Sequence, residues 1–127
     1  MGYKKKVVSN TTTNITKGIV NYLKSEGHSA SRVNTQGQWD EGSQSWRRSG
    51  SRKGYLDISA CIKSPINRIG IFLAIDVKKG NDTLSSDQIE FITEVTEAGG
   101  FAWEVSGVDE FIERFNNLIL MLKENGI

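Results

Sequence analysis

Three residues of the types used in hydrolytic chemistry lie near the middle of the chain: Asp57, Asp76 and Lys78. Asp76 and Lys78 stand two apart at the end of an apolar run, so in a strand their side chains share one face. Asp57 stands near the start of the preceding apolar run. If the two runs pair as an antiparallel hairpin, the three side chains converge. The alternative is a strand that ends in solvent with an exposed Asp–Lys ion pair.

The two carboxylates predict a site for a divalent metal ion. Two like charges held close together are unfavourable unless a cation lies beside them. Hard oxygen ligands suit Mg²⁺, which takes one or two carboxylates and keeps water molecules or substrate phosphate on its other positions. We therefore expect Asp57 and Asp76 to bind Mg²⁺, with Mn²⁺ as a substitute and the backbone carbonyl of Val77 as a further ligand.

Hydrophobic periodicity predicts the elements that would position these residues. The order is α-β-β-β-α-β-α, which indicates a fold of the α/β class, more closely an α+β arrangement in which helices flank a mixed sheet. We expect a single domain that spans residues 1–127. Ser85 and Gln88 form a capping-box pattern at the start of the second helix. The expected helices and strands, in chain order, are Thr11–Glu26, Ser29–Asn34, Tyr55–Ile62, Ile69–Lys78, Ser85–Ala98, Phe101–Ser106 and Val108–Glu124.

Strand alternation also assigns faces to the hairpin. It places Leu56 on the same core face as Ile58, and Ile69 on the core face of the second strand. It places Asp57 on the opposite face, with Cys61, which is interpreted as a small core residue. Pro65 lies in the turn between the two strands.

The charge distribution is uneven. Residues 1–56 hold ten Lys/Arg and three Asp/Glu and sum to +7, whereas residues 57–127 hold six and twelve and sum to −6. A basic half suggests a polyanionic partner such as DNA, because phosphate contacts supply most non-specific DNA affinity. The alternative is a solvated surface that happens to be uneven. Part of this charge lies in a basic N-terminal tail, residues 1–9.

The segment Thr35–Lys53 shows neither helical nor strand periodicity and is interpreted as a substrate-facing loop. Its two tryptophans, Trp39 and Trp46, can stack on unpaired bases or pack the loop onto the domain. Polar and basic residues in and around this loop are candidate DNA-binding residues: Arg32, Asn34, Arg47, Arg48, Arg52 and Lys53.

The single cysteine excludes an intrachain disulfide, and no apolar run approaches the length of a membrane span. The apolar stretch after Lys4–Lys6 is too short for a signal peptide. We therefore expect a cytoplasmic protein with no membrane partner, or one in the host-cell cytoplasm if a phage encodes it.

The sequence resembles the PD-(D/E)XK nuclease superfamily, and within it the VRR-NUC branch, which is similar to Holliday junction resolvases. The resemblance covers roughly Thr11 to Phe111. It rests on an ordered set of short segments: Gly54-Tyr55-Leu56-Asp57, Ala74-Ile75-Asp76-Val77-Lys78, Leu84-Ser85-Ser86-Asp87-Gln88, and Gly99-Gly100 followed by Phe101-Ala102-Trp103.

The resemblance implies a restriction-endonuclease-like αβββαβ core with an additional C-terminal helix, and a Mg²⁺-dependent nuclease that hydrolyses DNA phosphodiester bonds. It implies that Asp57 and Asp76 bind the metal, that Lys78 orients or deprotonates the attacking water, and that Gln88 supports the site. Gln88 also has a purely structural interpretation, as a capping-box residue. Relatives carry a glutamate on the first helix, where this chain has Asn14 as a neutral substitute.

Structure-selective cleavage of branched or flapped DNA and a homodimer are further expectations from the resemblance, with the apolar final helix or a strand edge as the interface. The main alternative is a DNA-binding module that kept the nuclease fold and lost activity, which the missing glutamate favours. An unrelated α/β nucleotide-binding protein is disfavoured, because no Gly-rich phosphate loop follows any expected strand.

Overall fold

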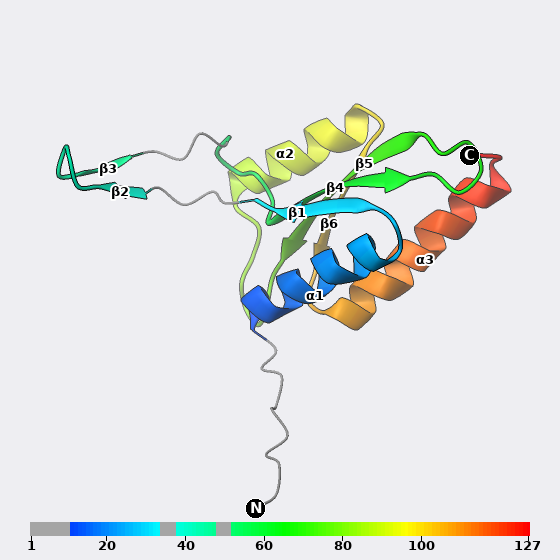
Figure 1. The fold of residues 1–127 in the computed structure, drawn as a ribbon, viewed down its shortest axis with the longest axis horizontal. Coiled ribbons are helices and arrows are strands. Elements are labelled where there is room, and N and C mark those ends of the chain that lie inside the picture. Colours follow the sequence, from blue (N-terminus) through cyan, green and yellow to red (C-terminus); the bar gives the residue numbers. More distant parts are fainter. Residues whose placement is uncertain (1–10, 34–37, 48–51) are drawn as a thin grey trace, which may run out of the picture.

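The computed structural model describes residues 11–33, 38–47 and 52–127. Within these ranges, three helices and four strands of a mixed sheet form an α+β fold, and two further strands form a separate hairpin (Figure 1). The elements, in chain order, are α1 (Thr12–Ser25), β1 (Ser29–Arg32), β2 (Gln38–Asp40), β3 (Ser45–Arg47), β4 (Ile58–Lys63), β5 (Gly70–Val77), α2 (Ser86–Glu97), β6 (Phe101–Val105) and α3 (Val108–Glu124).

The strand order in the sheet is β1-β4-β5-β6. The β1–β4 and β4–β5 pairs are antiparallel, and the β5–β6 pair is parallel, with α2 as the connection between β5 and β6. The expected hairpin with Pro65 in its turn is therefore confirmed. The carbonyl of Ile127 accepts hydrogen bonds from the backbone of Ile66 and Asn67, so the C-terminal end is attached to this turn.

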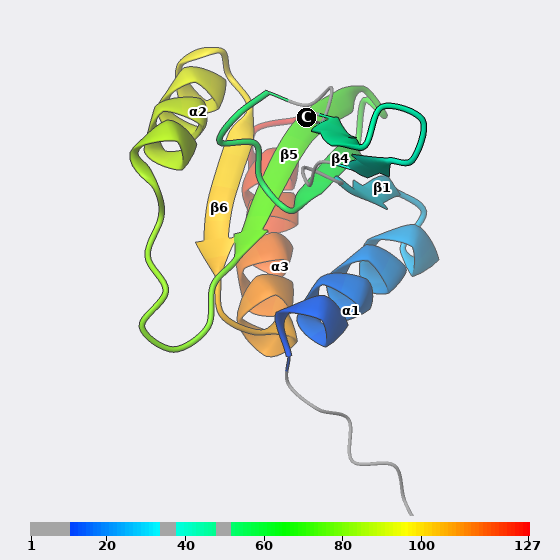
Figure 2. The ribbon, with the colours of Figure 1, turned by 90° about the vertical axis from the view of Figure 1, so that its left-hand side faces the viewer.

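The helices cover both faces of the sheet (Figure 2). On one face, α1 and α3 pack against the inward side chains of β4, β5 and β6 and form the main core. On the other face, α2 packs over a smaller cluster of Leu56, Ala74 and Phe91. Residues of β5 alternate between these clusters, as expected for a strand buried on both faces: Leu73, Ile75 and Val77 face the main core, whereas Ala74 faces α2.

The helix starts follow local hydrogen-bonding rules. The Thr11 side chain accepts from the backbone of Asn14 and begins α1, and Ser85 with Gln88 forms the expected capping box of α2. Gly107 provides no side-chain cap for α3. There the Glu110 carboxylate instead accepts from both the N–H and the hydroxyl of Ser106, and these bonds lower the pKa of Glu110.

Three local expectations were wrong at the ends of the hairpin strands. Leu56 is fully buried beneath α2 and does not share the main core with Ile58, because β4 begins only at Ile58 and the alternation does not extend before it. Ile69 precedes β5 and is 54% exposed. Cys61 is exposed on the sheet surface and is not a core residue.

The segment Thr35–Lys53 was expected to lack regular structure, yet it contains the antiparallel β2–β3 hairpin, in which Trp39 pairs with Trp46. In Figure 1 this hairpin is drawn away from the four-stranded sheet. Its substrate-facing role stays a prediction. The basic tail at residues 1–9 lies outside the described residues.

No helix in the described part of the chain combines the length and the apolar character that a bilayer span requires.

The main core depends on the Phe111 ring, which is fully buried and stacks on Phe115 at 5.6 Å between ring centroids. We expect Phe111→Ala to lower the free energy of unfolding by about 3–5 kcal/mol, because it removes buried area and leaves a cavity. Phe72→Ala is the matched control, because Phe72 is 37% exposed. This substitution should lower the free energy of unfolding clearly less. Urea unfolding of both variants checks this, and equal losses would contradict it.

Candidate active site

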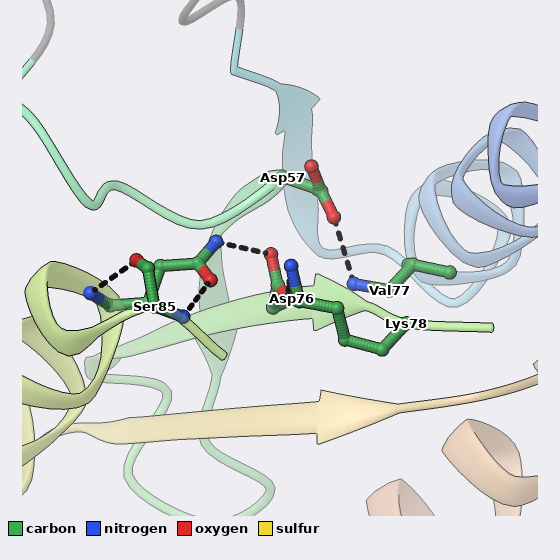
Figure 3. Close-up of polar contacts among 6 residues, drawn as sticks. Asp57, Asp76, Val77, Lys78 and Ser85 are labelled. Carbon is green, nitrogen blue, oxygen red and sulfur yellow. Dashed lines mark hydrogen bonds and ion pairs between the residues drawn. The ribbon is translucent and has the colours of Figure 1, made fainter. Parts of the chain in front are cut away.

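The register of the hairpin brings Asp57 and Asp76 together. Ile58 pairs with Ile75, so Asp57 and Asp76 occupy the next position across the two chains, just beyond the last pair of the antiparallel ladder. The Asp57 carboxylate accepts a hydrogen bond from the backbone N–H of Val77 at 2.8 Å (Figure 3). This bond replaces a ladder bond at the point where β4 has ended, and it fixes the Asp57 carboxylate beside β5.

Asp76 is buried, with 1% of its surface exposed, and its two oxygens differ in environment. Oδ1 accepts a hydrogen bond from Gln88 Nε2 at 3.2 Å. Oδ2 lies 3.2 Å from Lys78 Nζ as an ion pair, but it accepts no well-oriented hydrogen bond from the described residues. Figure 3 shows Asp57, Asp76 and Lys78 directed toward one another. The predicted convergence of the three side chains is therefore present.

The environment raises the pKa of Asp76 from its ordinary 3.8 to about 6. Burial is the largest cause, since it disfavours the charged carboxylate. The negative charge of Asp57 and hydrogen bonding between the two carboxyl groups act in the same direction, and Lys78 partly opposes them. Without a further cation, the Asp76 carboxyl group therefore keeps its proton up to a higher pH than an ordinary aspartate does.

Gln88 completes the expected capping box and also contacts Asp76, while its support of catalysis stays a prediction. Its Oε1 accepts from the Ser85 backbone N–H at 3.0 Å, and its own backbone N–H donates to Ser85 Oγ at 3.1 Å, which completes the capping box. Because Oε1 is held by Ser85, the amide nitrogen Nε2 is directed to Asp76. The start of α2 thereby sets the orientation of the Gln88 amide at the site.

The segment Arg52–Asp57 is docked on the first turns of α2. Gly54 has φ +84°, and a Cβ placed there would lie 2.5 Å from the backbone C and O of Asp87. The rings of Tyr55 and Phe91 pack at 4.7 Å between centroids. The packing of this segment against α2 therefore positions two groups of the site at once. Asp57 contacts the backbone of Val77, and Gln88 contacts Asp76.

The donor set fits a divalent cation of the Mg²⁺ type. Two carboxylates converge, and the buried Oδ2 of Asp76 has a lone pair that the described residues do not use. The N–H of Val77 points to Asp57, and the N–H and C=O of a strand residue point to the same edge, so the Val77 carbonyl is directed to that side as well.

The number of acidic ligands is small. Among the described residues, no group of three or more His, Cys, Asp or Glu side chains is placed to hold a metal ion. Asn14 is exposed in the first turn of α1. Its role as a ligand stays a prediction.

The predicted DNA-binding residues have different environments. Arg32 is exposed in β1 and lines a cavity of about 210 Å³ together with Lys17, a cation that the sequence reasoning missed. Arg52 pairs with Glu94 at 2.6 Å and covers the Phe91 ring, and Lys53 lies 3.6 Å from Asp87.

The remaining candidates lie outside what the structure describes. Asn34 and Arg48 fall in the gaps between the described ranges, and Arg47 is described only as a backbone position in β3. Their predicted roles therefore stay predictions.

Comparisons of this chain with protein-family models, with curated proteins and with solved structures found no match.

The close approach at Gly54 gives a first prediction for the site. Gly54→Ala should destabilise the protein well beyond the roughly 1–2 kcal/mol of a left-handed alanine, because the new methyl group meets the Asp87 backbone. Gly99→Ala is the matched control, since Gly99 has φ +92° and a methyl group added there would meet no atom within 4 Å. Chemical denaturation measures both variants, and equal losses would exclude a role for the close approach.

The raised pKa of Asp76 gives a second prediction. Between about pH 4 and pH 6 the folded protein keeps a proton that the unfolded chain has released, so this group's contribution to stability falls as pH rises through that window. Asp76→Asn removes this loss. The variant should therefore be more stable than the wild type at pH 8 in EDTA, by about 1–3 kcal/mol.

Thermal unfolding from pH 4 to pH 8 measures this difference. We expect Mg²⁺ to raise the Tm of the wild type at pH 8 and to leave that of Asp76→Asn unchanged. Parallel pH profiles for the two proteins would show that the Asp76 carboxyl group is not strained in the fold.

Proposed function

We propose that this protein is a metal-dependent endonuclease that hydrolyses DNA phosphodiester bonds. The observation that carries the proposal is the meeting of two carboxylates and an ammonium group at the end of one hairpin, with one buried carboxylate oxygen that the described residues leave without a hydrogen bond. A charged group is costly to bury, so such an arrangement is favoured where a ligand completes it.

Each side chain has a role that follows from its environment. Asp57 and Asp76 hold the cation, together with the Val77 carbonyl. Gln88 occupies Oδ1 of Asp76 and thereby leaves Oδ2 for the cation. Lys78, whose side chain is 21% exposed, can reach both Asp76 and a bound phosphate, where it orients water and offsets negative charge.

In the reaction, the oxygen of a water molecule forms a bond to phosphorus, the bond to the leaving oxygen breaks, and a proton is transferred to the leaving group. A bound Mg²⁺ would supply a more acidic water and neutralise charge on the phosphate. Arg32, which lies on the strand next to β4, is a candidate to contact the flanking backbone. We propose a preference for branched or flapped DNA, because no described element resembles a base-reading helix.

A second candidate is a DNA-binding module that is weakly active or inactive. The observation that favours it is the small acidic ligand set, because Asn14 stands where the resemblance implies a glutamate and no third acid joins the pair among the described residues. A dependence of turnover on Mg²⁺ separates the two candidates, since only the enzyme requires it.

A homodimer also stays a proposal. The apolar stripe of α3, which was considered as an interface, is buried against the sheet, as its residues Phe111, Phe115, Leu118 and Leu122 are in the core. Leu120 and Met121 remain exposed on α3, at 55% and 38%. Light scattering of Leu120→Glu and of the wild type measures whether they hold two copies together.

The decisive experiment is cleavage of single-stranded, linear duplex, supercoiled and four-way-junction DNA by the purified protein, with and without Mg²⁺ or Mn²⁺. We expect Asp57→Asn, Asp76→Asn and Lys78→Gln each to lower the cleavage rate by about a hundredfold or more, since each removes a metal ligand or a charge at the phosphate. Gln88→Ala should have a smaller effect, because Gln88 acts through Asp76.

Asp82→Asn is the control for a lost surface carboxylate, because Asp82 is exposed in the β5–α2 loop, and it should cut like the wild type. Wild-type cutting by Asp76→Asn or Lys78→Gln would overturn the assignment of the site. DNA binding by the wild type with no cutting at any divalent-metal concentration would favour the second candidate.

A further inference from the structure

A groove lies at the opposite end of the sheet from the acidic pair, between the C-terminal end of α1, the end of β4 and the outer part of α3. It encloses about 470 Å³ and is lined by three cationic side chains, those of Lys63, Arg68 and Lys123. We call these three residues and the space between them the basic groove. The proposed function makes no use of it.

The three cations are not neutralised by neighbouring acids. Over the described ranges, none of them forms an ion pair with a carboxylate, whereas other cations of the protein, such as Arg52 and Lys78, do. A single acidic residue, Glu26, lies at the groove. Because like charges gathered in one concavity are unfavourable, this arrangement is expected where an anion binds.

His28 adds a neutral hydrogen-bond donor to the groove. Its Nδ1 accepts from the backbone N–H of Lys63 at 3.0 Å, so in the neutral ring the proton is on Nε2. Burial and the nearby Lys63 charge lower the pKa of His28, which keeps the ring neutral. The ring packs edge-on against Phe115 at 5.2 Å between centroids, which fixes its orientation.

The position of the groove indicates which anion it accepts. The cations come from three separate elements, namely β4, the β4–β5 turn and α3, so together they can contact several phosphates of an extended chain. β4 is six residues long, which separates the groove from Asp57 by on the order of 20 Å along the strand.

The groove also lies on the other side of the sheet from the acidic pair. Asp76 is contacted by Gln88 from α2, whereas the groove is lined by residues of α1 and α3, which cover the opposite face. We expect a straight duplex that is held at Asp76 to stay on the α2 face, away from the groove. A second arm that leaves a branch point can pass over the end of the sheet and reach it.

From these observations we infer that the basic groove binds the phosphate backbone of a second DNA arm, so that Lys63, Arg68 and Lys123 favour branched over linear DNA. This inference rests on the proposed function, because the first arm is the one held at Asp57 and Asp76.

The test is binding of fluorescein-labelled DNA, followed by anisotropy with Ca²⁺ in place of Mg²⁺, with a four-way junction and a linear duplex that contain the same number of base pairs. The neutral variant carries Lys63→Gln, Arg68→Gln and Lys123→Gln. We expect its affinity for the junction to fall about tenfold or more and its salt slope to fall by about three, with the affinity for linear duplex unchanged.

Two further variants control for the fold and for charge. The charge-conserving variant, with Lys63→Arg, Arg68→Lys and Lys123→Arg, should bind like the wild type. Glu26→Gln removes the acid at the groove and should bind the junction more tightly than the wild type. Thermal unfolding of each variant identifies losses of affinity that come from unfolding.

Unchanged junction affinity in the neutral variant would overturn the inference, and so would an equal loss for junction and duplex. Binding of a polyglutamate peptide that the neutral variant loses, without any change in DNA affinity, would assign the groove to an acidic protein partner instead. Failure of the wild type to cut a junction that it binds through the groove would contradict the proposed nuclease and leave this inference standing.

Discussion

The electrostatic constraint at Asp76 organises this end of the molecule. A carboxylate that is almost completely buried beside a second one is disfavoured in its charged form. Asp76 is contacted by the Lys78 ammonium group and the Gln88 amide, and no described residue donates a well-oriented hydrogen bond to its Oδ2. A fully satisfied carboxylate would have an ordinary or lowered pKa and little affinity for a cation. An incomplete set of partners around a buried carboxylate costs stability, and such a cost is common at functional sites.

This strained arrangement is supported by ordinary packing around it. The main core, with its ring cluster around Phe111, fixes β4 and β5 from one face. On the other face α2 holds the chain before β4 through the close approach at Gly54 and the burial of Leu56. Because the capping box that begins α2 also orients Gln88, the stability of a helix end and the geometry of the site depend on the same hydrogen bonds.

Strand alternation and the capping-box pattern were enough to predict the hairpin, the shared face of Asp57, Asp76 and Lys78, and the start of α2. The errors lie where the period ends. Leu56 packs under α2 because no ladder constrains the residues before Ile58. The ion pairs of Arg52 and Lys53 with α2 depend on how the segment before β4 packs against that helix, and local sequence patterns do not predict such packing. The β2–β3 hairpin consists of strands of three residues each, too short for a period of two to be recognised.

The β2–β3 hairpin lies in the chain between β1 and β4, which are paired with each other in the sheet. The backbone N–H of Val33 donates to the carbonyl of Asp57 at 2.8 Å, so the chain leaves and re-enters the sheet at neighbouring positions. The register that aligns Asp57 with Asp76 is set by β1, β4 and β5 alone. We therefore expect that residues between Val33 and Arg52 can be exchanged or lengthened without shifting the carboxylates, so that the contacts made by this segment can change independently of the acidic pair.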